Sequence, residues 1–352
     1  MMKELRYGFI KRELQFNFQA RTSRGEIKTH NSYLVWAMHP SSLNDCGWGE
    51  AAPLMGLSPE GNDDFEELLN AALELLNEGH LLHDLDLAQA PSIRFAVETA
   101  QLDLWNGANR ILFDNPFTEG KAIPINGLVW MADTDTMLAE AFKKAEAGFD
   151  TLKFKIGAQQ LDEECKMLEQ FRKRYPHGKV EIRLDANGAF APDEAVAILK
   201  EFAKFSIHSV EQPIRAGLYD AMQEVCAKSS IPIALDEELI GINVEQDGSA
   251  LIQKIRPHFL ILKPTLLGGL QLSAKWVRKA QEAEIAWWAT SALESNIGLN
   301  AIAQWTSVQP GTLKHGLGTG SLYSNNIHSP LLVKNGALHY IATTQWQELS
   351  PL

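Results

Sequence analysis

The chain is predicted to form a (β/α)8 barrel of the TIM-like type that carries an α+β capping domain. From about residue 119 onward, short apolar runs alternate with longer amphipathic runs, which is the pattern of parallel strands each followed by a helix. The first 118 residues lack this alternation. The length of 352 residues exceeds one ordinary domain but suits a barrel with a smaller appendage.

Eight strand-like runs can be placed in residues 119–328, which we expect to form the catalytic barrel domain. They read IPINGLVWMA, DTLKFKIG, KVEIRLDANG, IHSVEQPI, IPIALDEE, FLILKPT, IAWWATSALES and, more weakly, KHGLGTG. The intervening runs, such as DTMLAEAFKKAEAG and SAKWVRKAQEAE, have the apolar spacing of helices. Strands that alternate with helices in this way favour a parallel barrel.

Residues 1–118 are expected to form an α+β capping domain that acts as a substrate lid. Strand-like LQFNFQA and SYLVWAMH come first, and the helical patterns FEELLNAALELLNEG and IRFAVETAQLDLW follow. The tail 329–352 contains PLLVKNGALHYIA, in which an Asn-Gly pair between apolar runs predicts a hairpin. We expect this tail to return to the capping domain.

Composition excludes several classes of partner. The net charge of −12 argues against binding to nucleic acid or to an anionic membrane. The three cysteines show no CxxC spacing, which indicates a reducing compartment and no disulfide or zinc framework. No signal peptide or membrane span is predicted from the sequence. We therefore expect a cytoplasmic protein with a small-molecule carboxylate as its partner, and a homo-oligomer is compatible with the sequence.

Ionisable residues occur at the carboxyl ends of five successive predicted strands. In a barrel this end carries the active site. Successive members from the third strand to the sixth are separated by 26, 25 and 27 residues, about one strand–helix unit each. The six residues are Lys153 and Lys155 in the second strand, Asp185 in the third, Glu211 in the fourth, Asp236 in the fifth and Lys263 in the sixth.

The three carboxylates of this set predict a metal site. Asp185, Glu211 and Asp236 would repel one another at one rim unless a cation lay among them, and ligands that are all oxygen suit Mg²⁺, or Mn²⁺. A divalent ion there would act as a Lewis acid for a substrate carboxylate. Proton removal from the adjacent carbon, giving an ene-diolate, then becomes feasible.

Lys153 and Lys155 lie two residues apart in a strand, so both side chains point to the same face. Neighbouring ammonium groups lower each other's pKa, so one lysine could act as a neutral base near pH 7. We expect Lys155 to transfer the proton. We expect Lys153 to keep Lys155 deprotonated and to help hold the substrate carboxylate.

These motifs resemble the enolase superfamily, in its muconate-lactonizing subgroup. The similarity rests on KFK at 153–155, DAN at 185–187, VEQP at 210–213, DE at 236–237 and KP at 263–264, and it extends to GWGEAAPLMGLSPE in the capping domain. The resemblance implies that the three carboxylates bind the metal and that Glu237 supports them without binding it. It also implies that Lys155 and Lys263 face each other across the substrate.

Within the subgroup, TSRGEIKTH, IRLDANGAF, TSALESNIGLNAIAQW and HGLGTGSLYSNNI are most similar to the o-succinylbenzoate synthase family of menaquinone biosynthesis. This resemblance implies a dehydratase, a carbon–oxygen lyase, that forms 2-succinylbenzoate. Lys155 would remove the proton α to the carboxylate and then assist departure of hydroxide from the same face. Lys263 would stay cationic and stabilise the enediolate, partly by a cation–π contact with the ring.

Several further residues are candidates for binding the substrate. Arg183 precedes Asp185 by two residues and points inward, where it would hold a substrate carboxylate or else seal the barrel interior. Asn187 belongs to the DAN motif, Ser291 ends the seventh strand, and Glu294 would orient the following loop. The loop Thr22–His30 of the capping domain, with Arg24, would close over the rim and exclude water.

Other functions remain open. An N-succinylamino acid racemase or a dipeptide epimerase would use the same metal and both lysines, one on each face of the substrate. Dipeptide epimerases tend to carry an acidic DxD motif after the eighth strand, and HGLGTGSLYSNN has none. Muconate cycloisomerase fits residues 290–327 less well. A non-catalytic barrel that binds a carboxylate should lack one of the six rim residues, and all six are present.

Overall fold

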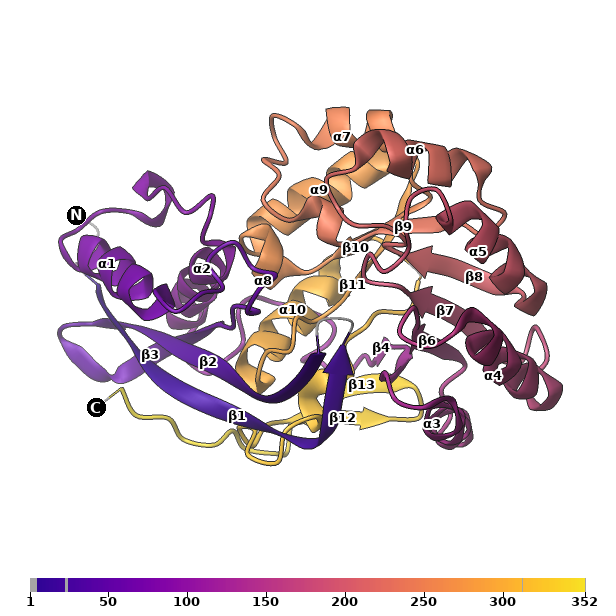
Figure 1. The fold of residues 1–352 in the computed structure, drawn as a ribbon. Coiled ribbons are helices and arrows are strands. Elements are labelled where there is room, and N and C mark those ends of the chain that lie inside the picture. Colours follow the sequence, from indigo (N-terminus) through magenta and orange to yellow (C-terminus); the bar gives the residue numbers. More distant parts are fainter. Residues whose placement is uncertain (1–4, 23–24, 312, 352) are drawn as a thin grey trace.

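The structure, a computed structural model, describes residues 5–22, 25–311 and 313–351. Figure 1 shows two parts side by side: an antiparallel sheet with helices α1 and α2, and a barrel surrounded by helices. The predicted fold, a barrel with an α+β cap, is confirmed. No helix among the described residues is long and apolar enough to cross a membrane.

Seven parallel strands form the wall of the barrel and are hydrogen-bonded in sequence order. Each predicted run from IPINGLVWMA to IAWWATSALES supplies one of them. Their apolar side chains are buried on both faces, because helices cover the outside of the sheet. The strands are β5 (Gly127–Val129), β6 (Thr151–Lys155), β7 (Glu181–Asp185), β8 (Ile207–Glu211), β9 (Ile233–Leu235), β10 (Phe259–Leu262) and β11 (Ala286–Ala289).

The weak eighth run, KHGLGTG, closes the barrel through single bridges. His315 bridges to Ile125 beside β5, and Gly316 bridges to Thr290 beside β11, both in parallel orientation. A Cβ on Gly316 would lie 2.6 Å from the Thr290 side chain, so glycine allows this close approach. The segment therefore completes the ring without forming a regular strand in the described residues.

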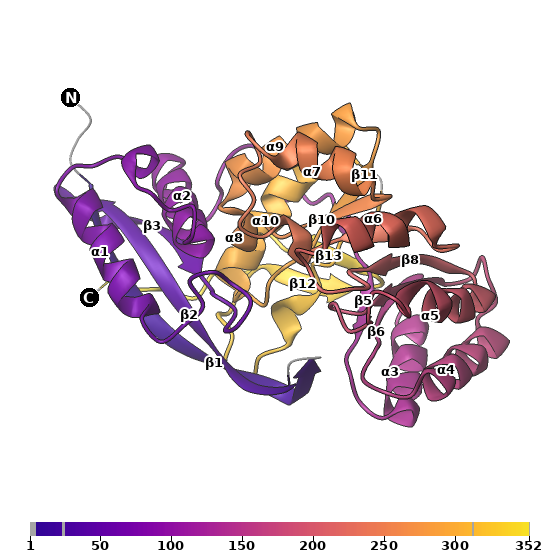
Figure 2. The ribbon, with the colours of Figure 1, turned by 45° about the horizontal axis from the view of Figure 1, so that its top comes forward.

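Helices pack around the outside of the barrel wall (Figures 1 and 2). Each begins after a strand, as the alternation of runs predicts, except α9, which follows the short helix α8. They are α3 (Thr134–Glu146), α4 (Leu161–Arg174), α5 (Ala195–Phe202), α6 (Tyr219–Lys228), α7 (Gly248–Ile255), α8 (Pro264–Leu267), α9 (Leu270–Glu282) and α10 (Asn296–Val308). Short 3-10 helices are η1 (Leu82–Asp84), η2 (Ala203–Phe205), η3 (Glu237–Leu239) and η4 (Thr319–Ser321).

The capping domain consists of three antiparallel strands and two helices. Strands β1 (Arg6–Thr22), β2 (Gly25–His39) and β3 (Ser42–Ala51) pair in chain order, and α1 (Phe65–Asn77) and α2 (Pro91–Trp105) cover one face of their sheet. The β1–β2 ribbon curves towards the barrel (Figure 1). Its register shifts between Gln15 and Ala20, so residues 16–19 leave the β2 ladder.

Two buried carboxylates dock the capping domain on the barrel helices. Glu50 of β3 accepts the backbone N–H groups of Ser295 and Gly298 at 2.7 and 2.8 Å, at the start of α10. Glu98 of α2 accepts those of Leu270 and Gln271 at 2.7 and 3.0 Å, at the start of α9. A helix N-terminus offers unpaired N–H groups and a positive dipole end, so each carboxylate caps a helix of the other domain.

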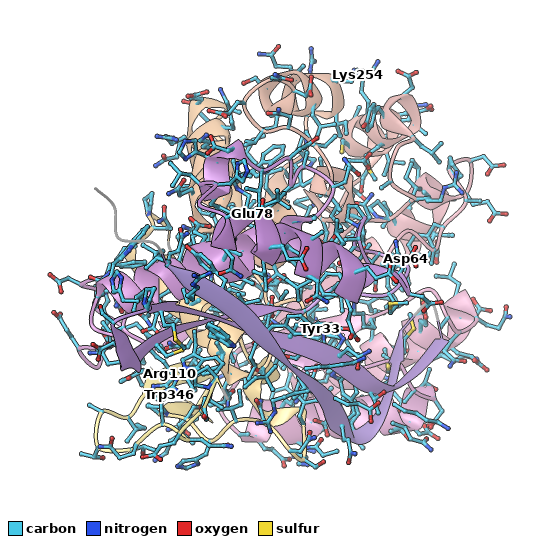
Figure 3. All side chains as sticks on the ribbon, turned by 90° about the vertical axis from the view of Figure 1, so that its left-hand side faces the viewer. Tyr33, Asp64, Glu78, Arg110, Lys254 and Trp346 are labelled. Carbon is cyan, nitrogen blue, oxygen red and sulfur yellow. The ribbon has the colours of Figure 1, made fainter. Side chains whose placement is uncertain are left out.

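The tail is divided between the two domains. The predicted hairpin forms as β12 (Leu331–Lys334) and β13 (Ala337–Tyr340), with left-handed Asn335 and Gly336 at the turn, and β13 pairs with β4 (Ile123–Pro124) beside the barrel. Contact with the capping domain comes from later residues. Trp346 and Leu349 pack against a cluster that Leu34 and Trp48 of the cap sheet form with Ile297 of α10. The Arg110 guanidinium lies 5.2 Å from the centre of the Trp346 ring, and the two residues are labelled next to each other in Figure 3.

Candidate active site

The six predicted ionisable residues lie together at the carboxyl ends of the barrel strands. Lys155 pairs in register with Asp185, and Asp185 pairs with Glu211 on the next strand. Asp236 directly follows β9, and Lys263 directly follows β10. Lys153 lies one pleat below Lys155 on the same face of β6, as the spacing of two residues predicts.

The ammonium groups of this rim are bound by its carboxylates. Lys153 Nζ lies 2.8 Å from Asp185 Oδ2 and 3.1 Å from both oxygens of Glu211. Lys155 Nζ shares Asp185 Oδ2 at 2.7 Å. On the other side of the rim, Lys263 forms an ion pair with Asp236. Two ion-paired groups therefore face each other across the mouth of the barrel.

Burial and charge shift the pKa values of these groups in different directions. Burial lowers the pKa of Lys153, but the charges of Asp185 and Glu211 raise it more, so the net pKa is above its usual value. Burial raises the pKa of Asp185, but the two ammonium groups outweigh it and hold that pKa well below its usual range. Lys263 behaves like Lys153: burial lowers its pKa, but the charges of Asp236, Glu237 and Glu211 together raise it more.

At Lys153, the predicted effect of the neighbouring ammonium group on the pKa is outweighed by the carboxylates. The sequence suggests that two neighbouring ammonium groups lower each other's pKa, whereas the pKa of Lys153 is raised. The physical reason is proximity, since carboxylate oxygens of two neighbouring strands lie within 3.1 Å of Lys153 Nζ. Opposite charges at that distance outweigh a like charge on the same strand.

The three carboxylates of the rim are oxygen ligands of the type that a hard divalent cation prefers. Asp185, Glu211 and Asp236 are fully or almost fully buried, and burial together with the charges of the two aspartates raises the pKa of Glu211 well above its usual value. Such mutual repulsion shows that the three carboxylates converge. A cation, the ammonium of Lys153, already bridges two of them. Among the described residues, however, no three acidic, histidine or cysteine side chains are arranged as a formed metal site.

Asn187 connects the catalytic lysine candidate to Glu237. Its side-chain Oδ1 accepts from Lys155 Nζ at 2.6 Å, and its Nδ2 donates to Glu237 Oε1 at 2.9 Å. Its backbone is left-handed, with φ of 45°, and its N–H donates to Asp185 Oδ1 at 3.1 Å. Asn187 was predicted to bind substrate. It lines the cleft, and in this structure its amide also holds the Lys155 side chain in place.

Gln212 is a supporting residue that the sequence reasoning missed. It is fully buried, follows Glu211 directly and has a left-handed φ of 40°. Its side-chain Oε1 accepts the Asp236 N–H at 3.1 Å, and its Nε2 donates to Glu238 Oε2 at 3.0 Å. The available signal was an amide directly after a carboxylate at a strand end, within the VEQP motif.

The backbone of Gln212 connects the ends of three neighbouring strands, β7, β8 and β9. Its carbonyl accepts the N–H of Gly188, which follows β7, at 2.7 Å, and its N–H donates to the Ala234 carbonyl in β9 at 2.9 Å. The side-chain bond to Asp236 adds a third connection. Gln212 therefore fixes the relative positions of the three strand ends that carry Asp185, Glu211 and Asp236.

Arg183 lies inside the barrel. Its guanidinium stacks on Trp288 at 4.2 Å, donates to Glu181 Oε1 at 3.0 Å and donates to the Lys314 carbonyl at 2.8 Å. The residue is 1% exposed and does not line the cleft. Of the two roles considered for Arg183, this position favours sealing of the barrel interior over contact with substrate.

Ser291 and Glu294 belong to the loop that follows β11. Ser291 lines the cleft, and its Oγ lies 2.6 Å from Thr319 Oγ1. Glu294 is fully buried and does not line the cleft. Burial raises its pKa to about 7, and it accepts hydrogen bonds from the Ala292 N–H and from the Thr265 hydroxyl. These contacts let Glu294 shape the loop, whereas Ser291 is placed to touch a ligand.

A cleft of about 1740 Å³ lies between the rim and the capping domain and continues along the barrel to Lys144, Phe149 and Leu331 near the other end of the strands. Lys153, Lys155 and Lys263 form part of its floor, while Phe18, His30 and Leu54 contribute from the cap. Of the predicted lid, Lys28, Thr29 and His30 line the cleft, and Arg24 lies outside the described residues. Aromatic contacts of Phe16 and Phe18 with Trp130 join this part of the cap to the barrel.

Comparisons with known proteins agree with this geometry. Residues 136–343 match the family model described as "Enolase C-terminal domain-like". An o-succinylbenzoate synthase of Desulfotalea psychrophila is 45% identical over 276 residues, covering 78% of this chain and 74% of the relative. An L-Ala-D/L-Glu epimerase of Bacillus subtilis is 24% identical, covering 92% of this chain and 88% of the relative.

Among solved structures, MenC from Desulfotalea psychrophila superimposes with a TM-score of 0.83 at 36% identity, covering 96% of this chain and 99% of that one. The match of the family model extends over more than half of the chain and contains Lys153, Lys155, the three carboxylates and Lys263. The chain belongs to the enolase superfamily.

Proposed function

We propose that this chain is an o-succinylbenzoate synthase, a carbon–oxygen lyase of menaquinone biosynthesis that removes water from its substrate to form 2-succinylbenzoate. The observation that carries the proposal is its similarity to the Desulfotalea psychrophila o-succinylbenzoate synthase, which extends over most of both chains. The rim of three carboxylates and three lysines supports the chemistry. The substrate is a small carboxylate, and the enzyme is cytoplasmic.

Mg²⁺ is the metal we propose, because enolase-superfamily enzymes use one or two Mg²⁺ ions with a lysine or histidine base. Asp185, Glu211 and Asp236 would hold it, with Mn²⁺ as an alternative. When bound, it supplies a Lewis acid for the substrate carboxylate. Glu237 contacts Asn187 beside these ligands and would support the site without binding the metal.

Lys155 is the proposed acid–base residue. Its nitrogen lies at the rim, and Asn187 Oδ1 accepts one of its hydrogens at 2.6 Å, which limits the directions in which the amine can point. As a base it takes the proton α to the substrate carboxylate. The resulting ammonium then gives that proton to the departing hydroxide, so water leaves and the ring becomes aromatic. One residue can do both steps because both occur on the same face of the substrate.

Lys263 and Lys153 have electrostatic roles in this proposal. Lys263 approaches from β10, four strands further round the barrel than Lys155 of β6, and therefore from the other side of the rim. Its pKa is raised, because the charges of Asp236, Glu237 and Glu211 together outweigh the lowering by burial, so Lys263 stays cationic and can stabilise negative charge on the substrate. Lys153 is buried below the rim and helps to hold the substrate carboxylate.

A racemase or epimerase is the second candidate, and one observation favours it. Lysines lie on both sides of the rim, so a substrate between them could lose a proton to one lysine and regain it from the other. An L-Ala-D/L-Glu epimerase is among the relatives, at 24% identity. The higher identity to the synthase and the absence of a DxD motif in HGLGTGSLYSNN rank this candidate second.

The proposal is tested with the purified chain, Mg²⁺ and the cyclohexadiene substrate of the synthase, by following loss of its ultraviolet absorbance. N-succinyl amino acids are incubated in parallel in D₂O, and deuterium at the α-carbon is measured. Rapid dehydration with slow or no exchange is the expected result. Fast exchange without dehydration would instead identify a racemase or epimerase.

Two controls connect the activity to the site. Lys155→Ala should abolish dehydration, whereas Lys204→Ala, on an exposed lysine paired with Glu201, should leave it unchanged. Exhaustive chelation should also abolish activity, and added Mg²⁺ should restore it. Full turnover by Lys155→Ala would contradict the role given to this lysine, and full turnover after chelation would contradict the metal role.

A further inference from the structure

The two faces of strand β2 have different environments. Tyr33, Val35 and Ala37 pack with the cap helices. Residues of the other face turn towards the barrel: Leu34 clusters with Ile297, and Ser32 donates to Glu50, the carboxylate that caps α10. Because side chains alternate along a strand, the even-numbered positions before Ser32 also belong to the barrel-facing side. These positions are Lys28 and His30.

Lys28 differs from the other lysines of the cleft in its charge environment. Seven lysines line the cleft, and six of them form ion pairs: Lys11 with Glu66, Lys143 and Lys144 with Glu140, Lys153 and Lys155 with Asp185, and Lys263 with Asp236. Lys28 has no carboxylate within ion-pair distance among the described residues. It lies opposite residues 16–19, where β1 leaves the β2 ladder.

His30 offers unused hydrogen-bonding capacity beside Lys28. It lines the cleft and is 6% exposed, yet neither ring nitrogen has a hydrogen-bond partner among the described residues, and Nε2 is completely buried. Burial lowers its pKa to about 4, so the ring is neutral at pH 7 and has one N–H donor. A buried polar group without a partner costs free energy unless something else satisfies it.

We propose that Lys28 and His30 form a cap-side anion site that binds the second carboxylate of a dicarboxylate substrate. The inference rests on the proposed function, because 2-succinylbenzoate carries one carboxylate on the ring and another at the end of the succinyl arm. In the proposed function, the rim lysines and the metal bind the ring carboxylate. The arm needs its own cation, since the chain as a whole has a net charge of −12 and repels a dianion.

The position of this site along β2 suits that role. Ser32 marks the contact between ribbon and barrel through Glu50 and Ser295. His30 and Lys28 lie two and four residues nearer the ribbon turn, about 7 and 14 Å further along the strand. Both residues line the same continuous cleft as the rim lysines. The proposal places one carboxylate of the ligand at the rim and the other at the ribbon, within this shared cleft.

The test compares two ligands with two lysine variants by calorimetric binding in the presence of Mg²⁺. The ligands are 2-succinylbenzoate and 2-butyrylbenzoate, in which a methyl group replaces the terminal carboxylate. Lys28→Met should weaken binding of 2-succinylbenzoate about tenfold, the value of one charge-assisted hydrogen bond, and leave 2-butyrylbenzoate within about twofold. The matched control is Lys11→Met, also on a cap lysine of the cleft but one paired with Glu66, and it should change neither affinity.

A second variant separates binding from folding. His30→Leu removes both ring nitrogens while filling a similar volume. Because the nitrogens have no protein partner, the variant should melt at the same or a higher temperature than the wild type, yet bind 2-succinylbenzoate about fivefold more weakly. A purely structural histidine would give the reverse result, with lower stability and unchanged affinity.

The outcomes distinguish this site from the proposed function. If the wild-type chain dehydrates the cyclohexadiene substrate but Lys28→Met binds 2-succinylbenzoate normally, the cap-side site is wrong and the synthase assignment stands. Equal weakening of both ligands by Lys28→Met would also overturn the site, since the effect would not depend on the second carboxylate. If the wild type neither turns over the substrate nor binds 2-succinylbenzoate, both proposals fail.

Discussion

Replacement of Gln212 by glutamate should weaken binding of Mg²⁺ without direct contact between the changed residue and the ion. The variant keeps the size of the side chain and one acceptor oxygen. It loses the Nε2–H donors to the Ile214 carbonyl and to Glu238 Oε2, both at 3.0 Å, and places a second carboxyl group against Glu238. That repulsion pushes against the hydrogen bond to the Asp236 N–H, which helps to position a proposed metal ligand.

The expected magnitude follows from these contacts. Each buried group left without its partner costs about 1–3 kcal/mol, so two lost donors should lower the free energy of unfolding by about 2–6 kcal/mol. Partners that orient metal ligands typically change metal affinity about 10–100-fold when mutated. We expect the lower end, about tenfold, because the backbone bonds of Gln212 to Gly188 and Ala234 remain.

A second buried glutamine provides the matched control. Gln304 is also fully buried, and its Oε1 accepts the Leu112 N–H at 2.9 Å while its Nε2 donates to the Arg110 carbonyl at 2.8 Å. It lies on α10, away from the cleft. Gln304→Glu loses one such donor bond and should therefore lower the free energy of unfolding by about 1–3 kcal/mol but leave the affinity for Mg²⁺ unchanged.

The assay measures metal affinity directly, by Mn²⁺ electron paramagnetic resonance with Mg²⁺ competition, and measures stability by urea unfolding. The role of Gln212 would be refuted if its glutamate variant bound Mn²⁺ with wild-type affinity. It would also be refuted if Gln304→Glu lost affinity to the same extent, because the effect would then come from general destabilisation.

Three further predictions concern other contacts. Asn187→Leu should lower kcat about tenfold or more with little change in KM, as measured by steady-state kinetics, because it removes the acceptor that orients Lys155 at 2.6 Å. Gly269→Ala should lower the free energy of unfolding in urea by about 2–4 kcal/mol, because the backbone φ at Gly269 is 111° and a Cβ there would lie 2.0 Å from Glu98 Oε2. The control is Gly178→Ala, where φ is 88° but the space around the Cβ is open, and it should cost only about 1–2 kcal/mol. Burial raises the pKa of Glu98 from 4.5 to about 7. Because the pKa of Glu98 is higher in the folded state than in the unfolded state, its stabilising contribution is complete below about pH 4.5 and is lost as the pH rises through about 7. The contribution amounts to about 3 kcal/mol. The free energy of unfolding of Glu98→Gln, measured in urea across this range, should therefore depend less on pH than that of the wild type.

The rim was predictable because each of its residues combines two local signals. An apolar run marks a buried strand, and the ionisable residue at or directly after its end marks the carboxyl edge. Parallel strands in register then bring Lys155, Asp185 and Glu211 side by side, which the spacing already indicates. Closure by His315 and Gly316 was visible only weakly, because two isolated bridges leave little of the alternation that identifies a strand.

Other features depend on contacts between distant segments. Strand alternation predicts that Arg183 points inward, but it does not show that the guanidinium reaches Trp288 and the Lys314 carbonyl. The raised pKa of Lys153 likewise depends on carboxylates of two other strands. Gln212 carries no charge that would single it out in a sequence, and its importance comes from bonds to residues that precede and follow it by more than twenty positions.

The capping domain and the barrel are coupled through the same short stretch that contains the proposed cap-side anion site. Ser32 binds Glu50, and Glu50 caps α10 immediately after the loop that carries Ser291 and Glu294. Displacement of the β1–β2 ribbon would therefore break the hydrogen bond that the Ser32 hydroxyl donates to Glu50 in a buried environment. This buried bond favours one position of the ribbon relative to the barrel. A fixed distance between ribbon and rim is what recognition of a ligand with two carboxylates requires, because only a ligand of matching length can satisfy both ends.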